Sequence, residues 1–286
     1  GRYRRRRRGR RQDDVRPSHL RMVKKSIFPA GEHLTVIVVA AGRGTRFGTD
    51  VPKQFLPLKG KPVVVHALEA FSAEFPKATI ILVLSADGGL EHWQRSSAMY
   101  HGTQPYIVYG GDTRTQSVRN ALDAAKKLGI HNESIVMIHD GARPIVNRGM
   151  IRNLYNMLAK VDRIHAAVPC YTPTEAMARV EMLTVAPTSR DNYCSVQTPQ
   201  TFDASMLIDS YRRLDAAGGG AYDDDAAVFA AFSGQPVYGY QGDRNNIKIT
   251  RPADIRIAEI LMEMPVPYEP LTITEQYLCL PPGVSI

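Results

Sequence analysis

The feature that most constrains this chain is a repeating alternation of short apolar runs with helix-like segments, which begins at Leu34. The first run, LTVIVVAA, is almost continuously apolar and rich in β-branched residues, as in a strand buried on both faces. Further runs of this kind lie at 78–85, 105–110 and 134–140, and segments with helical spacing of apolar residues lie at 62–75, 113–128 and 148–160. Strands that alternate with helices predict an α/β fold with a mostly parallel sheet and helices on both faces.

Residues 170–190 interrupt this alternation and are predicted to form a β-hairpin arm outside the core. The segment is polar, with Pro173 and Pro187 near its ends and only a short stretch of alternating apolar residues between them. The α/β pattern then returns with YCSVQTPQTF at 193–202, helices from Asp203 and Asp223, strands at PVYGY and NIKIT, and a closing helix from Pro252. We therefore expect one domain over 34–264 that includes the arm.

Charge sets the N-terminal segment apart from this domain. The first 21 residues hold ten arginines against two aspartates, a surplus that equals the net charge of +8 of the whole chain. Because blocks of like charge favour disorder, residues 1–33 are predicted to be a disordered basic tail and linker. The alternative is an arm that binds RNA or an anionic membrane through its charge. Residues 265–286 are rich in proline and are predicted to be an extended tail.

Several classes of protein are disfavoured by composition. No apolar run approaches the ~20 residues of a membrane-spanning helix, and the N-terminus lacks the apolar core of a signal peptide. The cysteines Cys170, Cys194 and Cys279 are widely spaced and odd in number, which predicts free thiols rather than a disulfide framework or a zinc site. We expect a cytoplasmic protein with no membrane partner.

A glycine-rich loop, AAGRGTRFG at 40–48, follows the first strand, with Lys53 and Gln54 shortly after it. Its spacing fits neither the Walker loop nor the dinucleotide-binding fingerprint. Glycines still allow backbone N–H groups to approach an anion, and the nearby cations Arg43, Arg46 and Lys53 suit a triphosphate. The alternative is an ordinary glycine turn with solvated arginines.

Asp140 ends the fourth predicted strand, in the segment HDGARP. Ligands of open α/β sheets bind beyond the carboxyl ends of the strands, where an aspartate can ligate Mg²⁺ together with phosphate oxygens. The alternative is an Asp140 that only accepts hydrogen bonds in a turn. His139 is predicted to be structural rather than catalytic.

These signals combine into a family resemblance. The segments AAGRGTRFGTDVPKQF, GGDTRTQSV, HDGARP, SRDNYCSVQTPQTF, YDDDAAV and NNIKITRPADI, which run in order from about residue 34 to 262, resemble the 2-C-methyl-D-erythritol 4-phosphate cytidylyltransferases of the non-mevalonate isoprenoid pathway. The resemblance implies a Rossmann-like nucleotidyltransferase fold with a protruding β-arm that forms a homodimer. It also implies that CMP is transferred from CTP to methylerythritol phosphate with release of pyrophosphate. The location would be the cytoplasm, or the plastid stroma in a plant or alga.

The resemblance also implies roles for individual residues. Catalysis would fall to Arg46, Lys53, Arg190 and Lys248, and Asp140 would hold Mg²⁺. Nucleotide binding would fall to Ala40, Ala41, Gly42, Gly44, Gly111, Asp112 and Ser117. The acceptor would contact Arg143, Thr174, Arg190 and Lys248, with Thr174 and Arg190 reaching across the dimer. The arm departs from the family pattern, because Pro173 stands where an acid is usual and one residue is inserted.

Two other functions remain open at this level. A ribitol 5-phosphate cytidylyltransferase would share most of these motifs, and the irregular arm does not separate the two acceptors. A non-catalytic RNA-binding module led by the arginine tail is disfavoured by the phosphate-site residues of the core. A phosphate monoester is mostly dianionic at neutral pH because its second pKa is near ~6, so the proposed transfer needs no general base.

Overall fold

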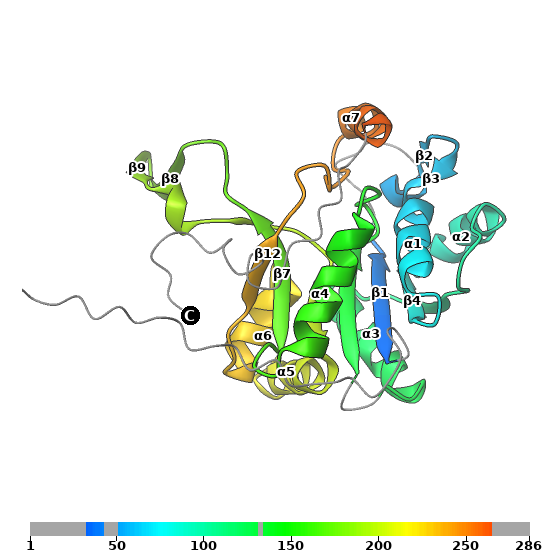
Figure 1. Cartoon of the computed structure of the whole chain (residues 1–286), viewed down its shortest axis with the longest axis horizontal. Helices are drawn as coiled ribbons and strands as arrows, with labels where there is room; N and C mark the ends of the chain where they lie inside the picture. The colour runs from blue at the N-terminus through cyan, green and yellow to red at the C-terminus, as the bar shows by residue number, and fades with distance from the viewer. Residues whose placement is uncertain (1–32, 43–50, 131–133, 265–286) are drawn as a thin grey trace, which may run out of the picture.

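The protein is built around one twisted sheet that helices cover on both faces (Figure 1). The computed structural model describes residues 33–42, 51–130 and 134–264. Strands run in the order β10-β7-β11-β6-β1-β4-β5, and β12 pairs with β7. The sheet strands are β1 (Leu34–Ala40), β4 (Thr79–Leu84), β5 (Tyr106–Tyr109), β6 (Ile135–Asp140), β7 (Ala166–Tyr171), β10 (Ser195–Val196), β11 (Gln200–Asp203) and β12 (Tyr238–Gln241).

The helices and the smaller elements pack around this sheet. The helices are α1 (Val63–Glu74), α2 (Gly89–Ser97), α3 (Arg114–Lys127), α4 (Arg148–Lys160), α5 (Ala204–Ala216), α6 (Asp225–Ser233) and α7 (Pro252–Glu263). Short 3-10 helices are η2 (Lys53–Phe55) and η3 (Arg190–Asn192), and two small hairpins pair β2 (Pro57–Leu58) with β3 (Lys61–Pro62) and β8 (Met177–Glu181) with β9 (Thr184–Thr188).

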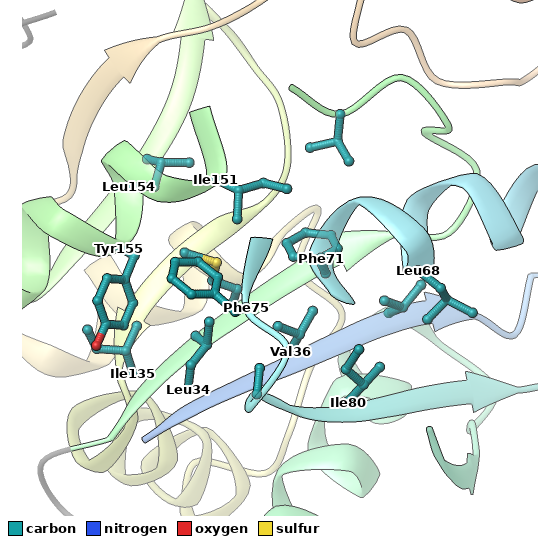
Figure 2. Close-up of a cluster of buried hydrophobic side chains, with 14 of the residues drawn as sticks. Leu34, Val36, Leu68, Phe71, Phe75, Ile80, Ile135, Ile151, Leu154 and Tyr155 are labelled. Atoms are coloured by element: carbon teal, nitrogen blue, oxygen red, sulfur yellow. The ribbon is translucent and has the colours of Figure 1, made fainter. Parts of the chain in front are cut away.

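Alternating side chains of β1 explain why helices are needed on both faces. Val36 and Val38 join a cluster with residues of α1 and α4, whereas Ile37 joins a cluster with residues of α3, α5 and α6. Figure 2 shows the first cluster, in which Leu34 and Val36 of β1 belong to the same group of side chains as Phe71 of α1 and Tyr155 of α4. A strand that is apolar on both faces can bury itself only in such a three-layer arrangement.

The predicted α/β fold is confirmed: the strands β5-β4-β1-β6 are parallel, and β12 is parallel to β7. Antiparallel β11 lies between β6 and β7, so the sheet is mixed. The predicted helices at 62–75, 113–128 and 148–160 correspond to α1, α3 and α4. Helix α2 and strand β7 were not anticipated.

The strand predicted at NIKIT is wrong. Residues 246–250 form no regular strand. Their apolar alternation arises because Ile249 is buried in a small cluster with Leu58, Val63 and Ala258. Its backbone N–H donates to the carbonyl of Ala142 at 2.8 Å rather than to a strand ladder.

The predicted arm is a hairpin of β8 and β9 that projects from the body of the molecule (Figure 1). No residue of either strand is buried, and Met182 and Leu183 at its turn are almost fully exposed. Cys170 and Tyr171, which the sequence interpretation placed in the arm, belong instead to β7 and pair with β10.

The predictions for the basic tail at 1–33, the tail at 265–286 and Cys279 lie outside the described residues, except for His33. Neither Cys170 nor Cys194 forms a disulfide within the described residues. Within the described ranges, none of the helices is both long and apolar enough to cross a membrane.

Candidate functional site

Three segments meet where the parallel strands end, and two glycines bring them together. A Cβ placed on Gly110 would lie 2.6 Å from Ala41 Cβ and 2.6 Å from Ser117 Oγ. A Cβ on Gly141 would lie 3.1 Å from Ala40 Cβ. Glycine at 110 therefore allows the segment after β5 to approach both the loop after β1 and the start of α3 closely.

Asp140 lies at the end of β6 among three cations. Its Oδ2 is 2.9 Å from Lys248 Nζ and 3.6 Å from Arg143 Nε, and its Oδ1 is 3.4 Å from Arg114 Nε. The predicted residues Asp140, Arg143 and Lys248 are thus brought together from β6 and from the loop before α7. Even with the carboxylate of Asp225, which also pairs with Arg114, three cations against two carboxylates leave a positive surplus that suits an anionic ligand.

The ionisation of Asp140 follows from these neighbours. Burial acts to raise the pKa of Asp140, but Arg114, Lys248 and Arg143 outweigh burial and hold the pKa well below its usual value. Asp140 is therefore an anion at neutral pH. Burial lowers the pKa of Arg143, and the attraction of Asp140 only partly offsets that effect.

His139 is fully buried and hydrogen-bonded through both ring nitrogens. Its Nε2 is 3.0 Å from the carbonyl of Arg143, which can only accept, so Nε2 carries the proton. Nδ1 then accepts from Thr198 Oγ1 at 3.0 Å, and Thr198 Oγ1 in turn accepts from the backbone N–H of Asp140 at 3.1 Å. His139 thus supports the backbone of Asp140, as expected of a structural residue.

Lowering the pH should destabilise the folded protein, because the buried His139 becomes protonated. Burial lowers the pKa of His139 from 6.5 to about 4, so the unfolded chain binds more protons between these values and the stabilisation by neutral His139 is lost as pH falls through that window. The expected loss is about 3 kcal/mol of unfolding free energy. Urea unfolding between pH 7 and 4 measures it. In His139→Gln this part of the pH dependence should vanish, whereas the exposed control His101→Gln should follow the wild type; parallel curves for His139→Gln and wild type would contradict the assignment.

The segment VQTPQ explains how distant parts of the site are held. Gln197 Nε2 donates to the carbonyl of Asp243 at 2.7 Å and thereby fixes the loop that carries Lys248. Gln200 Oε1 accepts from the backbone N–H groups of Asp225 and Ala226 at 3.1 and 2.9 Å and fixes the start of α6. Thr198, between them, supports Asp140 as described above.

The loop after β1 is anchored by a buried glutamine. Gln54 Nε2 donates to the carbonyls of Ala40 and Gly42 at 2.6 and 3.1 Å, which ties the end of β1 to η2. Lys53, the first residue of η2, therefore lies beside the loop that was predicted to bind phosphates. Gly44 and Arg46 lie outside the described residues.

The segment from Gly111 to Ser117 forms the capped start of α3. Thr113 accepts from the backbone N–H of Gln116, the N–H of Gly111 donates to Ser117 Oγ at 3.1 Å, and that of Asp112 donates to Gln116 Oε1 at 3.0 Å. A helix start next to a glycine-rich loop is a favourable place for an anion. Binding roles for these residues stay predictions.

Thr174 and Arg190 lie together on the exposed arm. Arg190 Nη1 donates to the carbonyl of Thr174 at 2.7 Å. Among the hydrogen bonds and ion pairs of the described residues, none joins either residue to Asp140, Arg143 or Lys248. The structure of a single chain thus separates the arm residues from the rest of the predicted site.

The carboxylate of Asp140 could serve as one protein ligand of Mg²⁺. No cluster of three or more His, Cys, Asp or Glu side chains arranged for a metal is found within 33–42, 51–130 and 134–264. Mg²⁺ is commonly held by one or two carboxylates with substrate phosphates and water as further ligands. The anionic Asp140 therefore fits a Mg²⁺ that shares its ligands with a nucleotide.

Two site residues were missed by the sequence interpretation. Arg114 contacts Asp140, and its Nη1 is also 2.8 Å from Oδ2 of the fully buried Asp225. A signal was present, because Arg114 is the first residue of a helix with no acidic residue in its first turn. A cation at that end opposes the helix dipole, which indicates a partner elsewhere in the fold.

Comparisons with known proteins identify the family of the chain. The family model described as 2-C-methyl-D-erythritol 4-phosphate cytidylyltransferase matches residues 34–264. Proteins of that name from Phocaeicola vulgatus and Bacteroides fragilis are each 38% identical to this chain, over 228 residues (79% of this chain, 98% of the relative) and 230 residues (80% and 99%) respectively.

Solved structures show the same fold. The 4-diphosphocytidyl-2C-methyl-D-erythritol synthase of Anaerococcus prevotii superposes with a TM-score of 0.67 at 24% identity, covering 82% of this chain and 97% of its own. The 2-C-methyl-D-erythritol 4-phosphate cytidylyltransferase of Thermus thermophilus gives 0.60 at 26% identity, covering 80% and 98%. The chain belongs to the 2-C-methyl-D-erythritol 4-phosphate cytidylyltransferase family.

Proposed function

We propose that this protein transfers CMP from CTP to 2-C-methyl-D-erythritol 4-phosphate, giving 4-diphosphocytidyl-2-C-methyl-D-erythritol and pyrophosphate. The observation that carries the proposal is the grouping of Asp140 with Lys248, Arg143 and Arg114 at the carboxyl end of the parallel strands, in a chain of this family. Relatives named for methylerythritol phosphate favour this acceptor over ribitol 5-phosphate. The cytoplasmic location stays a prediction.

The reaction needs charge compensation and alignment rather than proton removal. The acceptor phosphate is itself an anionic nucleophile that attacks the α-phosphorus of CTP in line with the departing pyrophosphate. His139 is buried and both of its ring nitrogens are engaged, so it does not act as a base. Catalysis is then the task of cations that hold two anions together and stabilise the charge that develops at phosphorus.

Each cation has a proposed place in this task. Lys53 and Arg46 serve the triphosphate at the loop after β1, and the capped start of α3 at Gly111, Asp112 and Ser117 serves the nucleoside. Lys248, which is partly exposed and paired with Asp140, serves the acceptor phosphate. Asp140 would hold Mg²⁺, which neutralises phosphate charge when it is bound.

The proposed enzyme is a homodimer formed through the arm. An isolated two-stranded hairpin is marginally stable in water, and β8–β9 pairs with no other described strand. The exposed Val180, Met182, Leu183 and Val185 would be covered by the twin arm of a second copy. Thr174 and Arg190 would then reach the acceptor in the partner's site.

One experiment tests the function directly. Pyrophosphate release is measured with Mg²⁺, CTP and either methylerythritol phosphate or ribitol 5-phosphate as acceptor. We expect the highest kcat/KM with methylerythritol phosphate and poor rates with ATP or GTP. Faster use of ribitol 5-phosphate would identify the other acceptor, and RNA binding that weakens steeply with salt but no pyrophosphate release would favour the RNA-binding module.

A further inference from the structure

A buried polar chain leads from the core of the protein to Asp140. The hydroxyl of Tyr211 on α5 donates to Asp225 Oδ1 at 2.6 Å. Asp225 Oδ2, at the start of α6, is 2.8 Å from Arg114 Nη1 on α3, and Arg114 Nε is 3.4 Å from Asp140 Oδ1 at the end of β6. Four elements are thereby linked through two carboxylates and one guanidinium.

Stability alone does not explain this chain of contacts. Asp225 is fully buried and Tyr211 is 3% exposed. A buried ion pair often stabilises a protein less than well-packed apolar residues of the same volume would. Arg114 also stands at the helix end where a cation is unfavourable. Such an arrangement is better explained by a requirement for a fixed geometry.

The protonation states keep the chain of contacts rigid. Burial, together with the charge of Asp225, raises the pKa of Tyr211 well above its usual value, so its hydroxyl stays a donor. Burial acts to lower the pKa of Arg114, but Asp225 and Asp140 outweigh burial and raise it. Gln200 Oε1 accepts from the backbone N–H of Asp225, while Tyr211 contacts Oδ1 and Arg114 contacts Oδ2 of its carboxylate.

The planar guanidinium of Arg114 links the buried Asp225 to Asp140 in the substrate site. Its planar fork lets one arginine contact two carboxylates in a defined geometry, which a lysine does not reproduce. With Arg114 held by Asp225, Oδ1 of Asp140 is fixed, and Oδ2 faces Lys248 and Arg143.

We propose that Tyr211, Asp225 and Arg114 form a positioning network that sets the orientation of Asp140 toward the nucleotide. The inference rests on the proposed function, because Asp140 is the residue assigned to hold Mg²⁺ there. None of the three residues needs to touch the acceptor. Their effect is exerted through the placement of a single carboxylate.

Tyr211→Phe tests the network at its far end, and Tyr100→Phe is a matched control. Tyr100 is also 3% exposed, and its hydroxyl donates to the carbonyl of Thr103 at 2.7 Å, in the other core cluster. Both variants should lower Tm by a few degrees. Only Tyr211→Phe should lower kcat, by roughly tenfold, as expected when a hydrogen bond to a charged group no longer holds a site residue.

A binding measurement distinguishes a role in positioning Asp140 from a general loss of protein stability. CTP affinity is measured by calorimetry with Mg²⁺ and with EDTA. In Tyr211→Phe the gain in affinity due to Mg²⁺ should shrink, while the affinity in EDTA stays at the wild-type value. Tyr100→Phe should keep both values. Wild-type kcat and an unchanged Mg²⁺-dependent gain in Tyr211→Phe would overturn the proposal.

A second set of variants keeps the test decisive if Tyr211→Phe does not fold. Arg114→Lys and Asp225→Asn should each lower kcat, and the double variant should be no worse than the poorer single one, because residues that act as a unit are non-additive. Arg119→Lys, which alters a surface pair with Asp215 on the same helix, is the control and should be unaffected. Additive losses would refute the network. An inactive wild type that binds CTP normally would instead refute the proposed function.

Discussion

Asp140→Asn is expected to lower kcat by roughly 10²- to 10³-fold, with the side-chain volume unchanged. The amide removes the negative charge that faces Arg143 and Lys248 and that Arg114 contacts together with Asp225, and it is a poorer ligand for a hard cation. The variant should also need more Mg²⁺ for half-maximal rate. Steady-state pyrophosphate release over a Mg²⁺ titration measures both effects.

Asp215→Asn is the control for this prediction. Asp215 forms an ion pair with Arg119 at 2.7 Å on the surface, so the same chemical change there should leave kcat and the Mg²⁺ requirement at wild-type values. Activity of Asp140→Asn within about threefold of wild type would contradict the assignment of Asp140 to the reaction, because losing a charge-stabilising group at a reacting phosphate costs far more.

The second large effect is expected from mixing two variants that are each weakly active. Lys53→Ala should lower kcat by roughly 10²-fold through the lost cation at the phosphates, and Arg190→Ala should be weak in its use of the acceptor. In a mixed dimer with shared sites, one site carries both defects and the other carries neither. Mixing should therefore restore up to about half of the normal activity per heterodimer, by two-fold symmetry.

The measurement uses equal amounts of the two variants after demonstrated subunit exchange. Lys59→Ala and Arg179→Ala are matched controls from the same two regions, since their side chains form surface ion pairs with Glu263 and Glu181. Each control should be active alone and unchanged on mixing. No recovery from the Lys53→Ala and Arg190→Ala mixture would mean that Arg190 serves its own chain or that the dimer does not share its sites.

Much of the fold was predictable because its signals are local. The buried run of β1 needs helices on both sides, and the helical spacing at 63–74 and 148–160 is long enough to be unambiguous. The segment NIKIT was misread because a buried Ile249 gives the same alternation in a loop as in a strand. Only the packing of α7 and the contact with Ala142 distinguish the two.

The residues of the candidate site were predictable where one sequence motif contains them. They were not predictable where a contact joins residues that are far apart in the sequence. Asp140 and Arg143 lie three residues apart, so one segment indicated both. Arg114 and Asp225 are distant in sequence, and their contact exists only because α3 and α6 cover the same face of the sheet. The placement of Thr174 and Arg190 at an acceptor site depends on a second chain and stays a prediction.

The segment at 197–200 also affects how this enzyme can evolve. Gln197, Thr198 and Gln200 hold three different parts of the site from a stretch of four residues. Because all three parts depend on one short stretch of backbone, a change in its course would displace them together, and we expect few such changes to preserve activity. The exposed residues of the arm make few such contacts, so we expect substitutions there to be tolerated more readily.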